Sequence, residues 1–105
     1  MTFDDVLQQV RSWIGIHVSV VVLISEHGPG TGWLCDMDGV LDRIDDPIPE
    51  VDQPVHYVRF VGGNGFALER TWFRHATWVE IAGERSLDAD FGAVTLSMSA
   101  APPSA

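Results

Sequence analysis

Residues 2–25 read TFDDVLQQVRSWIGIHVSVVVLIS, and this stretch decides the fold because its pattern changes from helical to extended at Gly15. Before that glycine, apolar residues recur every three or four positions, which places them on one face of a helix. They are Phe3, Val6, Leu7, Val10, Trp13 and Ile14. Thr2 is a candidate N-cap, and two acidic residues follow it in the first turn, where the helix dipole favours anions. We therefore expect one amphipathic helix over residues 2–14.

The rest of the chain predicts short β-strands joined by turns. Residues 17–25 are rich in Val and Ile, and residues 55–61 alternate between apolar and polar side chains, as strands do. Asp38-Gly39 and residues 62–65 (Gly-Gly-Asn-Gly) are hairpin signals, because the tight turns of hairpins need positive φ. We expect a single helical turn within residues 71–76.

Two later segments carry weaker patterns. Residues 83–90 are mostly polar and predict a connection, whereas residues 91–98 predict a last strand. Residues 100–105 contain two prolines and predict a flexible tail.

Together these elements predict a mainly β domain over residues 1–99 with one N-terminal α-helix. About 100 residues is the size of one domain. We expect a small antiparallel barrel of five or six strands, because closure removes the exposed edges that short strands otherwise present.

The order of the expected elements resembles that of the Sm-like small β-barrels over about Phe3 to Ile81. Gly39 and the turn at residues 62–65 fall where that fold has tight turns. The resemblance implies assembly into rings through pairing of strand edges, and many members of the family bind RNA. A monomeric SH3-like barrel fits the same pattern of elements.

The charge of the chain restricts its partners. Six basic and fifteen acidic residues give a formal net charge of −9 among 105 residues, and all six basic residues are arginines. This balance argues against nucleic acid as a partner, since a nucleic-acid binder neutralises phosphates with Lys and Arg. It also argues against adhesion to anionic membranes.

The compartment is predicted from the cysteine count and the hydropathy. The single cysteine, Cys35, cannot form an internal disulfide, which favours a reducing compartment. The longest apolar stretch, residues 18–24, is far shorter than the roughly 20 residues of a membrane-spanning helix. No basic signal-peptide region begins the sequence. We expect a cytoplasmic protein.

The sequence contains no recognisable set of catalytic or metal-binding residues. Cys35 precedes acidic residues, whereas an activated thiolate needs electropositive surroundings. The four histidines lack zinc-ligand spacing. The Asp36–Gly39 segment starts like a calcium loop, but Val40 and Pro47 occupy positions that need oxygen ligands. The sequence predicts no catalytic residue, no metal and no cofactor, and therefore no enzyme.

The candidate partner-binding residues are Arg70, Trp72, Phe73, Arg74 and Trp78. Arg and Trp dominate the energetics of protein interfaces, and an Arg over an aromatic ring gains a cation–π contact. The core is the more common place for the aromatic residues of this group, and a mixture of the two roles fits a segment that cannot turn every side chain inward.

These observations lead to three functional hypotheses. The first is a non-enzymatic interaction or assembly module, which self-associates through strand edges or binds a protein partner. The second is an Sm-like nucleic-acid-binding ring, in which Arg59, Arg70 and Arg74 gather into a basic zone. The third is an acidic domain that binds a basic protein partner through the loop from Asp42 to Asp52, a cluster that also leaves calcium binding open.

Overall fold

A computed structural model of the chain describes residues 1–24, 32–48 and 54–100, and it contains one helix, seven strands and one short 3-10 turn in those ranges. They are α1 (Phe3–Ser12), β1 (His17–Ile24), β2 (Gly32–Asp45), β3 (Val55–Phe60), β4 (Gly65–Glu69), η1 (Arg70–Trp72), β5 (His75–Ile81), β6 (Glu84–Asp90) and β7 (Val94–Ala100). The prediction of a mainly β chain with one N-terminal helix is confirmed.

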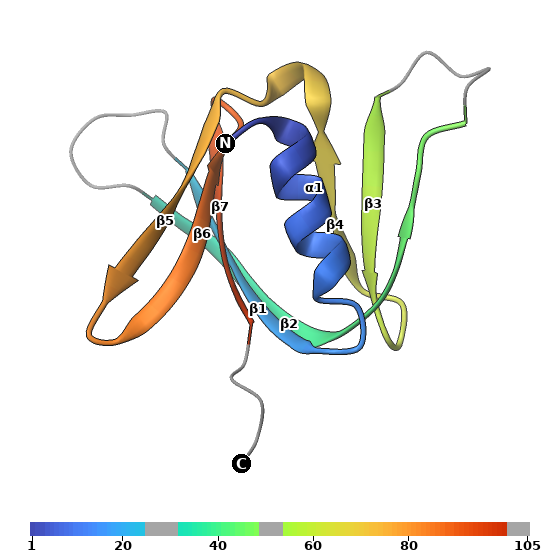
Figure 1. Ribbon diagram of the computed structural model, residues 1–105, viewed down its shortest axis with the longest axis horizontal. Helices are drawn as coiled ribbons and strands as arrows, with labels where there is room; N and C mark the ends of the chain where they lie inside the picture. The colour runs from blue at the N-terminus through green and yellow to red at the C-terminus, as the bar shows by residue number, and fades with distance from the viewer. Residues whose placement is uncertain (25–31, 49–53, 101–105) are drawn as a thin grey trace.

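The seven strands form one antiparallel sheet in the order β4-β3-β2-β1-β7-β6-β5. The sheet is not closed, because β4 and β5 lie at its two edges without pairing to each other. The expected barrel of five or six strands is therefore wrong in both strand number and closure. Figure 1 shows the sheet bent around α1, with β3 and β4 on one side of the helix and β5, β6 and β7 on the other.

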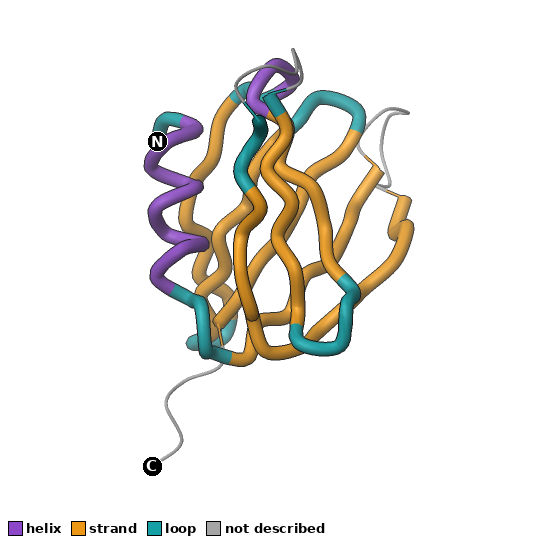
Figure 2. The backbone as a smooth tube through the Cα atoms, turned by 90° about the vertical axis from the view of Figure 1, so that its right-hand side faces the viewer, coloured by secondary structure: helices purple, strands orange, loops and turns teal. Residues whose placement is uncertain are grey.

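The helix lies inside the bend of the open sheet, whose two edge strands would pair with each other in a closed barrel. Its apolar face is buried against the concave side of the sheet, and Figure 2 shows the helix along one side of the bent sheet. The core is formed by this face and the inward residues of the strands, among them Val20, Leu41, Val58, Leu68, Leu87 and Met98. Burial of apolar surface stabilises such a core by about 25 cal/mol per Å². Packing of the helix therefore buries the apolar residues of the concave face although the sheet does not close into a barrel.

The predicted N-cap of the helix is confirmed. The Thr2 hydroxyl accepts a hydrogen bond from the Asp5 backbone N–H at 3.2 Å, and the Asp5 carboxylate accepts one from the Thr2 backbone N–H at 2.8 Å. This reciprocal pair satisfies two N–H groups that the first helical turn leaves without partners. The bond from the Thr2 backbone also lowers the pKa of Asp5. The helix ends at Ser12, two residues before the predicted end.

The predicted turn at Asp38-Gly39 is absent, because both residues lie within β2. β2 is a single strand of 14 residues that pairs with β1 over its first part and with β3 over its last part. At Gly39 a Cβ atom would lie 3.2 Å from the Phe60 side chain. The glycine therefore gives room for close packing where the strand passes from one neighbour to the other, rather than for positive φ.

The second predicted turn is confirmed, since Gly62 and Gly63 have φ of 102° and 103° between β3 and β4. The polar connection expected over residues 83–90 is wrong, because this segment is β6. Only Leu87 and Ala89 of β6 are buried, so two apolar residues on alternate positions are the whole signal for the strand.

The last strand and the helical turn also have other bounds in the structure than the sequence predicts. β7 begins three residues later than predicted and includes Ala100, which was assigned to the tail, while residues 101–105 lie outside the described residues. The helical turn is confined to η1, and β5 begins at His75, inside the segment predicted to form the turn. The composition of residues 27–32 (His-Gly-Pro-Gly-Thr-Gly) predicts a further turn, and this segment lies outside the described residues except for Gly32, which opens β2.

Candidate functional site

The η1 turn joins β4 to β5 and therefore connects the two edges of the open sheet. Beside it lies a surface pocket of about 410 Å³, lined by residues 71–74 and by residues 91–93 of the turn between β6 and β7. We call this the η1 pocket. The register of β5 with β6 brings these two segments together, since His75 pairs with Asp90.

The base of the pocket is held in place by a cluster of three phenylalanine rings. The centroids of Phe73 and Phe91 lie 5.7 Å apart, and each ring also lies near Phe3 of α1, at 5.7 and 6.4 Å. The three ring pairs have interplanar angles of 68° to 86°. Phe3, which is 5% exposed, belongs to two of these pairs. Edge-to-face packing of this kind fixes ring orientation as well as burying apolar area. The start of the helix therefore anchors the pocket.

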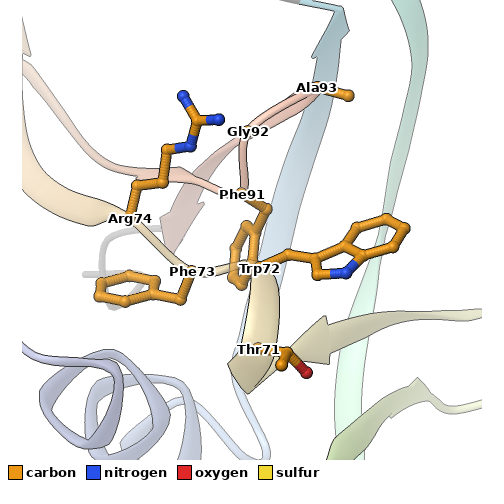
Figure 3. Close-up of a pocket in the computed structure, with 7 residues that line it drawn as sticks. All are labelled: Thr71, Trp72, Phe73, Arg74, Phe91, Gly92 and Ala93. Carbon is orange, nitrogen blue, oxygen red and sulfur yellow. The ribbon is translucent and has the colours of Figure 1, made fainter.

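Trp72 and Arg74 form the open part of the pocket. Figure 3 shows their side chains projecting to opposite sides of Phe91. Trp72 is 62% exposed, although tryptophan is among the residues that gain most from burial. A large exposed ring beside an exposed guanidinium is a combination typical of the energetically dominant residues of interfaces.

Arg70 points away from the pocket, toward the helix. Its guanidinium donates a hydrogen bond to the Asp4 carboxylate at 2.7 Å and lies 4.5 Å from the centroid of the Phe3 ring. Both contacts are within the chain, so Arg70 joins η1 to the first turn of α1. The proposal of Arg70 as a partner-binding residue receives no support from this arrangement.

Trp78 lies on β5, outside the pocket. Its ring packs edge-on against Trp13 of the helix, with centroids 6.3 Å apart, and the Arg85 guanidinium lies 4.0 Å from its centroid. Trp78 is half-buried. It therefore covers the space between β5 and the end of the helix while leaving part of its surface at the sheet edge.

Of the five candidate residues, the structure thus brings Trp72, Phe73 and Arg74 together in one pocket and places Arg70 and Trp78 elsewhere. Sequence reasoning missed the second wall, residues 91–93. Phe91-Gly92 directly after an acidic residue is a turn signal, but only the pairing of β5 with β6 shows that this turn lies next to η1.

The arginines differ in how they are paired. Arg11, Arg43, Arg59 and Arg70 each form an ion pair with an aspartate, and the Arg85 guanidinium lies over Trp78. Arg74 forms no ion pair and no ring contact with any residue that the structure describes. Its guanidinium lies near Gly92, where a Cβ atom would be 3.5 Å from its Nε.

The acidic residues Asp45 and Asp46, at the end of β2, form ion pairs within the chain. The Asp45 carboxylate accepts hydrogen bonds from Arg59 at 2.6 Å and from Arg43 at 3.0 Å, and the Arg59 bond lowers the pKa of Asp45 most. Asp46 bonds to the His56 Nδ1 at 2.9 Å and accepts a bond from Arg11; its pKa is lowered, first by the His56 contact. Residues 49–53 of the predicted acidic loop lie outside the described residues.

Other candidate chemistry stays dispersed. Cys35 is half-buried and packs against the core beside β1. Among residues 1–24, 32–48 and 54–100, no three His, Cys, Asp or Glu side chains lie close enough to hold a metal ion. In the same ranges, no helix has the length and apolar character needed to cross a membrane.

The edge of β5 is the second feature of the site. β5 spans seven residues, contains no proline and pairs with β6 without a bulge from His75↔Asp90 to Ile81↔Glu84. Within the described part of the chain, no backbone hydrogen bond joins its outer edge to another element. Figure 1 shows β5 diverging from α1 toward the turn that leads into β6. The end of β5 therefore presents backbone N–H and C=O groups that a further strand can pair with.

Comparison with known proteins adds no further constraint: no family model, no curated protein and no solved structure matches the chain.

Proposed function

We propose that the protein is a non-enzymatic assembly module that self-associates by antiparallel pairing of β5 with β5 of a second copy. The observation that carries this proposal is the unblocked edge of β5 in a sheet that ends there. Addition of a strand to such an edge gains main-chain hydrogen bonds along its whole length.

β5 has few of the features that usually protect an edge strand. Proteins protect such edges with charged side chains, above all lysine, and with proline, bulges or very short strands. β5 contains no lysine and no proline, is seven residues long and pairs without a bulge, and its one acidic residue is Glu80. By contrast, β4 at the other edge has five residues and begins with a glycine. β5 is therefore the better candidate for the interface.

The ion pairs of the arginines bear on the nucleic-acid hypothesis. A basic zone built from Arg59, Arg70 and Arg74 would need all three guanidinium groups to be available for phosphates. Arg59 and Arg70 are instead bound to Asp45 and Asp4. This favours protein self-association over a nucleic-acid-binding ring as the proposed function.

Two aspartates on one face of the sheet support a basic protein partner as the second candidate. By register, Asp36 and Asp88 lie in one cross-strand row with Val21 and Ser97 between them. Neither aspartate forms an ion pair with a described residue. Salt-dependent binding of a basic protein that is lost in Asp36→Asn/Asp88→Asn would support this candidate, and unchanged binding would refute it.

The assembly proposal is tested by placing charge on the edge. In an antiparallel pair of β5 strands centred on Trp78, Thr77 of one copy lies opposite Val79 of the other. The double variant Thr77→Lys/Val79→Lys puts like charges directly opposite each other at both positions, which disfavours pairing. We expect the native chain to reach twice its mass of 11.5 kDa as concentration rises, and this variant to stay monomeric.

The variant Thr77→Lys/Val79→Glu is the matched control, because it removes the same two side chains but places opposite charges across the interface. We expect it to form dimers. Light scattering coupled to size-exclusion chromatography measures all three masses. A native chain that stays monomeric at every concentration, or a Lys/Lys variant that dimerises as the native chain does, would refute the assembly proposal.

A further inference from the structure

Among the residues that the structure describes, Arg74 is the arginine without an aspartate or an aromatic ring as a partner. The chain has a net charge of −9, and its other arginines each contact an aspartate or lie over a ring. Arg74 is exposed and lines the η1 pocket. A guanidinium presents a planar fork of donors that matches the oxygens of a carboxylate or phosphate group. The pocket therefore offers a set of donors to an anionic group.

Aromatic rings form the floor and one wall of the η1 pocket. Phe73 and Phe91 lie beneath it in the cluster with Phe3, and the wall is Trp72, which is 62% exposed. Figure 3 shows Trp72 and Arg74 on opposite sides of Phe91, so a ligand that contacts both carries its charge at one end and its apolar part at the other. The cavity of about 410 Å³ lies within the roughly 300–1,000 Å³ of small-molecule sites.

Hydrogen bonds fix the backbone on both sides of the pocket. The Arg74 backbone N–H donates to the Asp90 carbonyl oxygen at 2.8 Å, and the Phe91 N–H donates to the Val94 carbonyl oxygen at 2.8 Å. The Gly92 N–H donates to the Asp90 carboxylate at 2.7 Å. A site whose backbone is set before binding loses less conformational entropy when a ligand enters.

The charges around the pocket favour a ligand with a single negative charge. One guanidinium compensates one charge, and the acidic chain as a whole repels a second. The Asp90 carboxylate, which pairs with His75, also lies directly before the wall at Phe91. A carboxylate carries one negative charge at neutral pH, whereas a phosphate monoester carries nearly two. These charges select a carboxylate over a phosphate group.

We propose that the η1 pocket binds a small monocarboxylic acid with an aromatic body. The carboxylate accepts two hydrogen bonds from the Arg74 guanidinium, and the aromatic body lies over Phe91 against Trp72. Residues 91–93 follow β6, so the pocket lies on the β6 side of β5, away from the free edge of the sheet. The inference therefore goes beyond the proposed self-association and does not depend on it.

Hydrocinnamate is the probe, and hydrocinnamamide is its neutral counterpart of nearly the same shape. Titration of each into the isotope-labelled chain, followed by heteronuclear NMR, measures both affinity and location. We expect the acid to shift the amide signals of residues 71–74 and 91–93. We expect its amide to bind about tenfold more weakly, because it loses hydrogen bonds between charged groups. Shifts that centre on another element would refute the site.

Arg74→Gln tests the charged contact. Hydrocinnamate should bind this variant about tenfold more weakly than the native chain, whereas hydrocinnamamide should bind both alike. Arg85→Gln is the matched control, because it removes the same charge from a guanidinium that lies over Trp78, outside the pocket. It should keep native affinity. An equal loss in Arg85→Gln, or an equal loss for the acid and its amide in Arg74→Gln, would refute the contact.

Two further measurements test the aromatic body and the class of anion. Trp72→Ala should weaken hydrocinnamate binding, whereas Tyr57→Ala, which removes another exposed ring on β3, should leave it unchanged. Equal affinities for these two variants would contradict the aromatic contact. Phenyl phosphate should bind more weakly than hydrocinnamate, and tighter binding would overturn the assignment of a carboxylate. Circular dichroism verifies that each variant is folded.

Discussion

Replacement of Phe3 by alanine tests whether the first turn of the helix holds η1 in place. The Phe3 ring is 5% exposed and lies 5.6 Å from His56, 5.7 Å from Phe73 and 6.4 Å from Phe91, measured between ring centroids. Arg70 covers the ring at 4.5 Å. Phe3 therefore joins α1 to the pocket wall and to His56 of β3.

The expected cost follows from this burial. Removal of a buried phenylalanine side chain costs about 3–5 kcal/mol of unfolding free energy. We expect about 4 kcal/mol at Phe3, because four aromatic or cationic partners lose a neighbour at once. This is a large share of the 5–15 kcal/mol that stabilises a typical domain. At about 4 °C per kcal/mol for a domain of this size, the unfolding temperature should fall by about 15 °C.

Urea unfolding followed by circular dichroism measures the change, with Phe66→Ala as the control. Phe66 is half-buried, and among the described residues its ring packs against one other aromatic ring, that of Phe60, so we expect a clearly smaller loss. Phe3→Leu keeps the variant measurable if the alanine form does not fold, and should cost about 1–2 kcal/mol. A loss at Phe3→Ala below about 1 kcal/mol, or below that of Phe66→Ala, would refute the anchoring role.

Two further predictions concern packing and pH. A Cβ atom on Gly65 would lie 2.1 Å from the Val58 carbonyl oxygen, so Gly65→Ala should lower the free energy of unfolding by about 1–3 kcal/mol. Gly39→Ala should cost less, because its Cβ atom would meet a side chain at 3.2 Å. Equal urea midpoints for the two variants would contradict this. The contact with His56 depresses the pKa of Asp46, so its stabilisation is complete above the carboxyl's unfolded pKa of about 4 and is lost as the pH falls through the folded pKa. Asp46→Asn should therefore be less stable than the native chain at pH 6 and approach it in urea titrations below about pH 4; a constant difference would exclude the proposed linkage.

The helix could be predicted from sequence because its signals are local. The apolar spacing from Phe3 to Trp13 marks the buried face, and Thr2 marks the helix start. β6 could not be predicted, because Leu87 and Ala89 are too few to show alternation clearly. Its position in the sheet depends on pairing with β5 and β7 on both sides, which is a property of the whole fold.

The candidate site was predicted in part for a similar reason. Aromatic and arginine enrichment identified Trp72 and Arg74, but composition carries no direction for a side chain. Arg70 has the same residue type as Arg74, yet it binds Asp4, which lies 66 positions earlier in the chain. The opposite wall, at Phe91, depends on strand register, which no local pattern in η1 specifies.

The geometry of η1 explains why core and interface roles are combined in one short segment. A 3-10 helix has three residues per turn, so its consecutive side chains point in directions about 120° apart. In η1 this turns Arg70 toward the helix and leaves Trp72 exposed, and Phe73 then returns to the core against Phe3. The inward contacts fix the backbone from which Trp72 projects. An exposed ring held on a fixed backbone loses less conformational entropy on being covered by a partner than a ring on a flexible loop does, so the packing of α1 on η1 prepares Trp72 for such a contact.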